Sequence, residues 1–259
     1  MTGPSPSRAI GDLTFQEAGA ALRASSILCL PMGSMEQHGP HLPLNTDTVL
    51  AEAFTGKIIA RWGEAYDLWR LPPVPIGLSR EHDWASGTLS LSVGGMTAYL
   101  RDLARDIARS LPARNLMIVN GHGGNRGILE ALGRELSGDF GFNLCTLHLG
   151  AMMSTATDAT APDIHAGKDE TSVMLALAPD LVRRDRIRYL KAPPDNDAVR
   201  AAILDPAVSW PWSSGDKRLA DLGVIGDAAS ASAEHGHAIV ERVVERAGAV
   251  LKQLRDGQV

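Results

Sequence analysis

Short apolar runs alternate with amphipathic patterns through the middle of this chain, and this alternation is the strongest constraint on its fold. We predict strands for four brief apolar runs bordered by Gly or Pro: Ile27–Met32, Leu68–Val74, Leu116–Val119 and Phe142–Leu149. We predict helices where apolar residues recur at helical spacing between them: Val49–Trp62, Thr97–Leu111 and Arg126–Leu136. Repeated strand, helix and strand predict an α/β fold with a mostly parallel sheet, covered by helices on both faces.

The last third of the chain is less regular. Two further helices are predicted, over Glu170–Ala178 and Ala233–Leu254. Between them, Asp180–Asp227 is irregular, rich in Pro and charge, and contains Trp210–Trp212, which covers either the site or an oligomer contact. Because no internal repeat, low-complexity segment or linker divides the sequence, we expect a single domain over residues 1–259.

Composition and charge exclude several classes of protein. The chain has 259 residues, 44% of them hydrophobic, enough for a core that buries about three quarters of the unfolded surface. A net charge of −5, without a block of like charges, argues against a nucleic-acid partner. The N-terminus lacks an apolar signal sequence, and the longest uncharged stretch, Phe140–Thr157, is too polar to span a membrane. We therefore expect a cytoplasmic protein that has no membrane partner.

Polar residues after the first predicted strand are the first candidates for chemistry, because ligands bind beyond the carboxyl ends of parallel strands. Glu36 and His38 are two residues apart, so in extended backbone both side chains point the same way. Pro40 and Pro43 forbid a helix and stiffen the loop that returns Asp47 toward them. In one interpretation, these three residues form half of a metal site. In the other, Asp47 caps the next helix, and Glu36 and His38 are solvated loop residues.

The segments after the third and fourth predicted strands carry similar residues. Asn120–Asn125 holds His122 among glycines, but lacks the order of a nucleotide-binding or phosphate loop. Its glycines let the backbone approach a ligand, or simply pack a strand against a helix. After the fourth strand come His165 and Glu170, and Glu170 also suits the N-terminus of the predicted helix.

Taken together, three separate crossover ends each present a histidine, and two of them also present a carboxylate. Chance rarely produces such a convergence. The resulting set has five ligands with an acidic excess, which suits two divalent ions that share one bridging carboxylate. The set consists of Glu36, His38, Asp47, His122 and Glu170.

Long motifs in these segments resemble those of a known family. Three blocks are similar to the signature blocks of the creatininase (creatinine amidohydrolase) family: Glu36–Asp47, Asn120–Asn125 and His165–Ser172. The family's substrate-loop and C-terminal blocks are matched by Ser79–His82 with Gly87–Ser90, and by Gly223–Asp227. The similarity runs from about Ile10 to Val250 in the family's order. It implies a three-layer α/β/α sandwich, a homo-oligomer that is often a hexamer, and a two-metal hydrolase site.

The resemblance also implies a role for each ligand. Glu36 and His122 would hold one ion, His38 and Glu170 the other, and Asp47 would bridge the two. Zinc is the first expectation for the two divalent metal ions, with manganese or iron as the other metals found in the family.

Catalytic and substrate-binding residues follow from the same motifs. His165 matches the family's active-site histidine, which would carry a proton to the departing nitrogen, and we assign catalysis to His165 and Glu170. In the alternative, His165 only orients Glu170 through a hydrogen bond. The candidate substrate contacts are Ser79, His82, Gly123 and Gly124.

Departures from the family pattern bear on the substrate. Creatininase proper has a metal-binding carboxylate where this chain has Gly124, so Glu170 is chosen as that ligand, as in relatives with the Gly-Gly form. It also has an acidic residue where this chain has Ile164, and a tryptophan that Met152–Ile164 lacks. These departures argue against creatinine itself as the substrate.

We therefore expect a dinuclear-metal-dependent amidohydrolase. Through a metal-bridged hydroxide, it would cleave a non-peptide C–N bond in a small molecule such as a cyclic amide or formamide. The alternative is a peptidase of the same family that trims a ribosomally made peptide, as in mycofactocin maturation. An open cleft at Trp210–Trp212 would favour the peptide, and a lidded pocket the small amide. A binding module without hydrolytic activity is a third reading, against which the complete ligand set argues.

Overall fold

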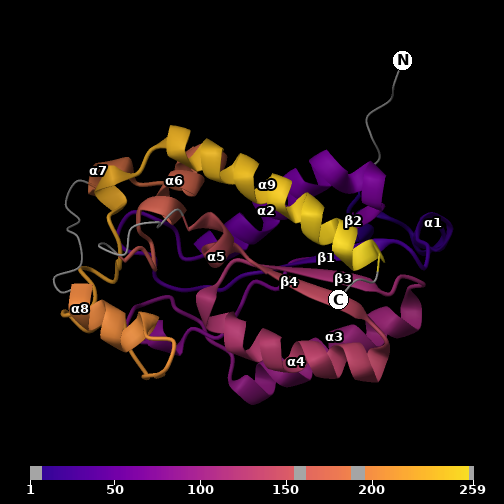
Figure 1. Ribbon diagram of the computed structural model, residues 1–259, viewed down its shortest axis with the longest axis horizontal. Coiled ribbons are helices and arrows are strands. Elements are labelled where there is room, and N and C mark those ends of the chain that lie inside the picture. The colour runs from indigo at the N-terminus through magenta and orange to yellow at the C-terminus, as the bar shows by residue number, and fades with distance from the viewer. Residues whose placement is uncertain (1–7, 155–161, 188–195, 257–259) are drawn as a thin grey trace.

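The computed structural model describes residues 8–154, 162–187 and 196–256. Its centre is a parallel sheet of four strands in the order β2-β1-β3-β4 (Figure 1). The strands are β1 (Ile27–Met32), β2 (Leu68–Arg70), β3 (Asn115–Asn120) and β4 (Asn143–His148). The chain runs from β1 outward to β2 and then returns past β1 to β3. The strand order therefore reverses between β1 and β3, the position where open α/β sheets bind ligands.

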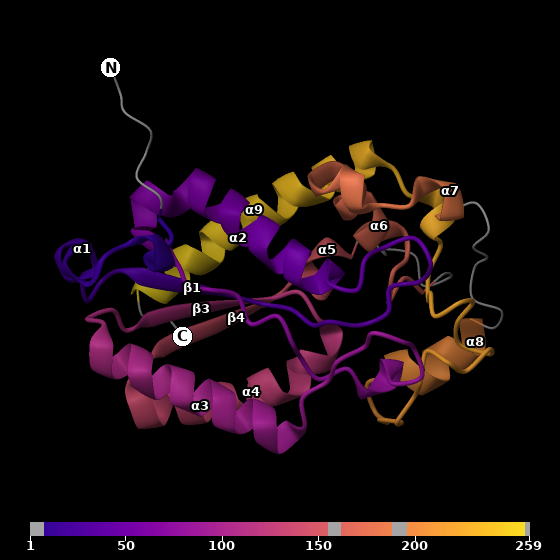
Figure 2. The same cartoon turned by 180° about the vertical axis from the view of Figure 1, so that it is seen from behind.

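Helices cover both faces of the sheet (Figures 1 and 2). One face carries α3 (Val93–Ser110) and α4 (Arg126–Phe140). The other carries α2 (Thr46–Tyr66) and α9 (Ala233–Asp256), with α6 (Lys168–Leu177) packed against α9. The shorter helices are α1 (Phe15–Ala21), α5 (Leu149–Met153), α7 (Arg184–Ile187) and α8 (Asn196–Val199). The predicted three-layer α/β/α sandwich is confirmed.

Alternate residues of each central strand enter two different apolar layers. In β1, Ile27 and Cys29 pack toward α2 and α9, whereas Leu28 and Leu30 pack toward α3 and α4. A strand between two helical layers buries both of its faces, so its sequence is a continuous apolar run rather than an alternating one. This is why Ile27–Met32 stands out in the sequence, and all of its residues are buried.

Phe54 in α2 is one of the largest fully buried side chains of the layer beneath α9, with 0% of its surface exposed. We expect Phe54→Ala to lower the free energy of unfolding by about 3–5 kcal/mol, because it leaves a cavity in a packed layer. Phe15 in α1 is 86% exposed, so Phe15→Ala is the matched control and should change stability by less than about 0.5 kcal/mol. Denaturant unfolding of both variants tests this, and equal losses would contradict it.

Some boundaries differ from the sequence prediction for identifiable reasons. The predicted strand Leu68–Val74 ends early, at Arg70, because Pro72 and Pro73 have no N–H group for the ladder. Helix α3 starts before the predicted Thr97, because the side chain of Ser92 accepts a hydrogen bond from the backbone N–H of Gly95. Both changes leave the order of the elements as predicted.

The region Asp180–Asp227 was predicted to be irregular, and its described residues, 180–187 and 196–227, contain short helices; several residues after 196 form a small apolar cluster. Val199, Leu219 and Ile225 are buried in it, and Ile225 pairs with His165 through an isolated bridge. In Figure 1 this region lies beside the carboxyl ends of the strands, to the left of the sheet. Among the described residues, none of the helices is both long and apolar enough to cross a membrane.

Candidate active site

The candidate site lies where the strand order reverses. Glu36 and His38 follow β1, and His122 follows β3; the last residues of these strands, Met32 and Asn120, are partners in the sheet. The loops after neighbouring parallel strands begin side by side, so the residues they carry meet above the sheet edge. The structure thus brings together the first two groups of candidate ligands.

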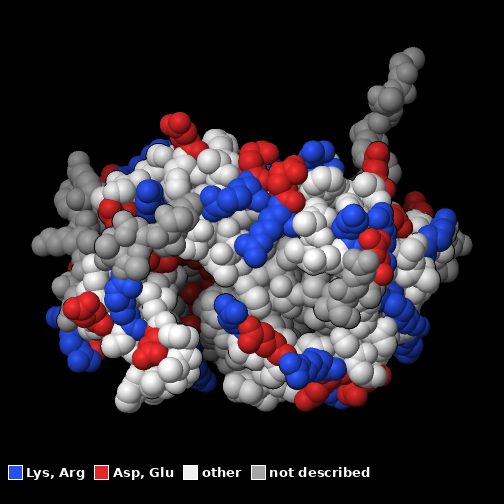
Figure 3. Space-filling view, in the orientation of Figure 1, with Lys and Arg blue, Asp and Glu red and all other residues white. Residues whose placement is uncertain are grey.

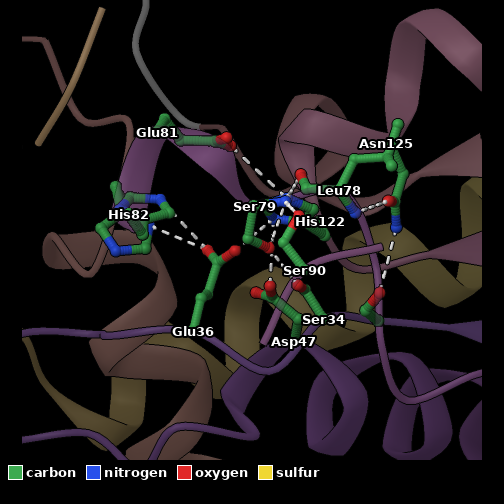
Figure 4. A network of polar contacts seen from close by, with 12 residues as sticks. Ser34, Glu36, Asp47, Leu78, Ser79, Glu81, His82, Ser90, His122 and Asn125 are labelled. Carbon is green, nitrogen blue, oxygen red and sulfur yellow. Dashed lines mark hydrogen bonds and ion pairs between the residues drawn. The ribbon is translucent and has the colours of Figure 1, made fainter. Parts of the chain in front are cut away.

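Asp47 lies between the imidazoles that the two loops supply. Its Oδ1 is 3.1 Å from Nε2 of His38, and its Oδ2 is 3.1 Å from Nδ1 of His122. Glu36 approaches the same Nδ1 of His122 with Oε2, at 3.2 Å (Figure 4). Glu36 and His38 are 0% exposed and Asp47 is 1% exposed, so the solvated alternative for the loop residues is wrong.

Asp47 reaches this position because helix α2 begins unusually close to the strand ends. A Cβ atom on Gly121 would lie 2.3 Å from the backbone oxygen of Asp47, and one on Gly33 would lie 2.4 Å from the backbone nitrogen of Thr48. Only glycine at both positions permits this approach. The N-cap of α2 is Asn45, so the alternative in which Asp47 is that cap is wrong.

Glu170 and His165 reach the site from the start of α6. Glu170 accepts a hydrogen bond from the backbone N–H of Ala166 at 2.6 Å, and its carboxylate lies in one group of potential ligands with the imidazole of His38 and the carboxylate of Asp47. His165 places Nδ1 3.7 Å from Oε1 of Glu36. Between them, Ala166 has a φ of +53°, a conformation that costs energy for a residue with a side chain and often marks a functional site.

The donor set fits divalent cations. Both carboxylate oxygens of Glu36 and Oδ2 of Asp47 are buried and, within the described part of the chain, lack a hydrogen bond, although imidazole nitrogens lie 3.1 to 3.3 Å from them. Uncompensated burial of carboxylates is costly, and carboxylate and imidazole together suit zinc, manganese or iron. In three groups, the potential ligand atoms lie within 4.8 Å of one another: Glu36, His38 and His165; Glu36, Glu81 and His122; His38, Asp47 and Glu170.

The predicted substrate contacts occupy different places. His82 is buried, 3.3 Å from Oε1 of Glu36 through Nε2, and its ring stacks on that of His165 at 4.2 Å. Gly123 and Gly124 line the cavity described below. Ser79 is fully buried behind His122, where its hydroxyl bonds to that of Ser34, and it does not belong to the cavity wall.

Several residues of the site were missed by the sequence analysis. Glu81 joins Glu36 and His122, although its place directly before His82 in a recognised block offered a signal. The Gln37 side-chain amide lies 3.0 Å from both His82 and His165, and no sequence pattern indicated these contacts. Ser214, in the irregular region, has its hydroxyl 2.7 Å from Nδ1 of His82 and 3.2 Å from the amide of Gln37.

Burial and the surrounding charges shift the pKa values of these groups. Burial alone would raise the pKa of Glu36, but His122, His82 and His38 hold it well below its usual range. Burial raises the pKa of Glu170, against the opposing effect of His38. Burial, together with the neighbouring His82 and His38, holds the pKa of His165 well below its usual range, so this imidazole is neutral near pH 7.

Most of the candidate ligands line an open cavity: Glu36, Asp47, His122 and Glu170. The cavity has a volume of about 560 Å³, and its walls include Glu36, His165 and the segment Trp210–Trp212. The same segment also lines a neighbouring cavity of about 590 Å³, so the two spaces adjoin at this wall. Figure 3 shows acidic residues deep in a hollow to the left of centre on this face of the molecule.

Comparisons with known proteins agree with this geometry. The family model described as creatinine amidohydrolase matches residues 11–251. The mycofactocin precursor peptide peptidase of Mycobacterium tuberculosis is 35% identical over 246 residues, covering 91% of this chain and 88% of that protein. The creatinine amidohydrolase of Pseudomonas putida is 32% identical over 258 residues, covering 91% and 93%.

Solved structures show the same relationship. A crystal structure of creatinine amidohydrolase (creatininase) superposes with a TM-score of 0.77 at 28% identity, covering 96% of this chain and 98% of that one. The structure titled "Creatininase Mn" gives a TM-score of 0.76 at 28% identity, with 97% and 98% covered. Because the family model spans most of the chain, and relatives above 30% identity cover nine tenths of it, the chain belongs to the creatininase family of amidohydrolases.

Proposed function

We propose that this chain is a hydrolase that uses two divalent cations to cleave an amide bond in a peptide. The observation that carries this proposal is the convergence of buried, hydrogen-bond-deficient carboxylates with imidazoles on the floor of an open cavity. Two cations bound there would lower the pKa of a shared water toward neutrality and polarise the amide carbonyl.

In this proposal, the metal-ligating residues form two sets, one for each cation. Glu36 and His122 would hold one cation and His38 and Glu170 the other, and Asp47 would be shared by the two. Its support is that each carboxylate oxygen of Asp47 already contacts the imidazole of a different position, at 3.1 Å in both cases. Zinc, manganese and iron all suit this donor set.

His165 is proposed to move a proton to the departing nitrogen. It lines the cavity, and its Nε2 lies 2.8 Å from the backbone oxygen of Gln37. Since a carbonyl oxygen only accepts hydrogen bonds, Nε2 carries the proton of the neutral ring and Nδ1 carries the lone pair. That lone pair faces the Glu36 side of the site, where a proton can be received and later given to the leaving group.

A peptide substrate is favoured over a small amide by the shape of the site and by the relatives. The cavity is open, and at Trp210–Trp212 it adjoins a second cavity that gives room for a chain beyond the cleaved bond. Trp210 is 61% exposed and does not close the site. Peptidases that act on the mycofactocin precursor peptide are 34–35% identical to this chain. A small cyclic amide or formamide remains the second candidate, supported by the creatinine amidohydrolase that is 32% identical.

Hydrolysis of a substrate panel tests the proposal. The protein, supplied with zinc or manganese, is incubated with mycofactocin precursor peptide, unrelated short peptides, creatinine and formamides, and the products are identified by mass spectrometry. We expect cleavage of the precursor peptide, loss of that cleavage when a chelator is added, and at least about a hundred-fold slower reaction with creatinine, since binding beyond the cleaved bond contributes to catalysis. Turnover of a small amide while every peptide stays intact would assign the second candidate instead.

A further inference from the structure

The side-chain amide of Gln37 is held in one orientation by the backbone. Gln37 is 6% exposed, and its Oε1 accepts a hydrogen bond from the N–H of Gly39 at 2.9 Å. Its Nε2 donates a hydrogen bond to the backbone oxygen of Gly223 at 3.1 Å. Because a backbone N–H only donates and a carbonyl oxygen only accepts, exchanging the two ends of the amide would break both bonds. Nε2 therefore has one hydrogen left to donate.

Two imidazole nitrogens lie within reach of that remaining hydrogen. Nε2 of Gln37 is 3.0 Å from Nδ1 of His82 and 3.0 Å from Nε2 of His165. The second of these cannot accept it, because Nε2 of His165 carries a proton that it gives to the backbone oxygen of Gln37, 2.8 Å away. The amide of Gln37 therefore faces Nδ1 of His82 as a donor.

A proton on Nδ1 of His82 is incompatible with these contacts. It would point at the Gln37 amide nitrogen, placing donor against donor at 3.0 Å. The hydroxyl oxygen of Ser214 would then have three donors for two lone pairs, since it lies 2.7 Å from Nδ1, 3.2 Å from Nε2 of Gln37 and 2.8 Å from the indole N–H of Trp84. Nδ1 of His82 is therefore the bare nitrogen, and Nε2 carries the proton.

His82 and His165 thus present opposite groups to the same part of the site. His82 ends the short 3-10 turn Arg80–His82, and its Nε2 lies 3.3 Å from Oε1 of Glu36 (Figure 4). That oxygen has no hydrogen bond from any residue in the described part of the chain, so the N–H is not engaged by it. The bare Nδ1 of His165 lies 3.7 Å from the same oxygen. Both rings line the cavity, and they stack 4.2 Å apart.

We propose that Gln37 is a positioning residue that fixes the ring protons of His82 and His165, and that the N–H of His82 binds the carbonyl oxygen of the amide to be cleaved. Negative charge develops on this oxygen during hydrolysis, and a fixed N–H donor stabilises it. The lone pair of the neighbouring His165 receives the proton. The positions of the ring protons stand on the contacts alone, whereas their use in catalysis rests on the proposed function.

Solid-state ¹⁵N NMR on zinc-supplied, histidine-labelled protein reports which ring nitrogens carry protons. Signals lost in His82→Phe and in His165→Ala identify the two rings among the eight histidines. In wild type we expect a proton on Nε2 and none on Nδ1 in both rings. In Gln37→Glu the carboxylate only accepts, so Nδ1 of His82 should gain a proton, while His165, bound to a backbone oxygen, stays unchanged. Gln16→Glu, the same change on an exposed residue of α1, should leave both rings as in wild type.

The catalytic use of the His82 N–H is tested by His82→Phe. Phenylalanine keeps a flat ring beside His165 but has no donor. We expect kcat on the precursor peptide to fall by about 100–1,000-fold, the usual cost of removing one donor to the developing oxyanion, while bound metal stays at the wild-type level.

Each measurement has an outcome that contradicts one part of the inference. A proton on Nδ1 of His82 in wild type would overturn the assignment, and this result requires no variant to fold. If His82 were unchanged in Gln37→Glu, which circular dichroism checks for folding, Gln37 would not fix its proton. A wild-type kcat in His82→Phe would remove the catalytic role. Failure of wild type to cleave any substrate would contradict the proposed function instead, because the spectra do not depend on turnover.

Discussion

Replacing Asp47 by alanine is expected to lower the bound metal from about two equivalents per chain to less than one and to slow hydrolysis by at least about a thousand-fold. The physical reason is that its carboxylate contacts His38 through one oxygen and His122 through the other, both at 3.1 Å. Removing it takes one ligand from each proposed cation at once. Elemental mass spectrometry on protein purified without chelator, together with the rate on the precursor peptide, measures both effects.

The matched control for this experiment is Asp83→Ala. Asp83 follows the same turn that carries Glu81, but its side chain is 48% exposed and pairs with Arg80 at 3.0 Å. Exposed pairs of this kind contribute little to stability, so the variant should keep both metal equivalents and the wild-type rate. Retention of two equivalents by Asp47→Ala would show that this residue does not bridge the ions.

His165→Ala is expected to lower kcat by about a hundred- to ten-thousand-fold while the metal content stays at the wild-type level. The side chain lines the cavity, and the backbone oxygen of Gln37 fixes its ring at 2.8 Å. Its loss removes a proton carrier without removing any of the proposed ligands. Parallel measurement of kcat and of bound metal distinguishes this role from a purely orienting one.

His41 provides a buried histidine for comparison. Its Nε2 lies 2.8 Å from the hydroxyl of Thr171, and it does not line the cavity. We expect His41→Ala to lower the thermal midpoint of unfolding but to leave kcat close to wild type. If His165→Ala instead released metal, the proton-transfer role would be wrong and the histidine would be acting on the ligands around it.

Most of the fold could be predicted because central strands with two buried faces leave an unmistakable sequence pattern. Ile27–Met32 was predicted to the residue for this reason. Helix α1 was missed because none of its residues is buried, so it lacks an apolar stripe. Its one signal was local: Thr14 and Glu17 form a capping box at its start.

The candidate ligands near strand ends could be predicted for a related reason. Glu36 and His122 lie a few residues beyond β1 and β3, so the rule for parallel sheets brings them together without knowledge of the loops. Glu81 follows a long irregular stretch after β2, and its path depends on tertiary hydrogen bonds such as that from Leu78 to Asn125. Its one signal was its place directly before His82 in a recognised block, and this did not suffice to predict that it lies beside Glu36 and His122.

The hydrogen bonds of Ser214 have a consequence for how substrate preference can change during evolution or by design. The residues proposed to bind metal come from the sheet edge, α2 and α6, whereas Trp210–Trp212 comes from a separate irregular segment. Ser214 connects this segment to the site through His82, since its hydroxyl lies 2.7 Å from Nδ1 of His82, whose Nε2 lies 3.3 Å from Glu36, and it also accepts a hydrogen bond from Trp84 at 2.8 Å. We therefore expect that a change of sequence at Trp210–Trp212 alters which substrates are bound while the residues proposed to bind metal stay in place.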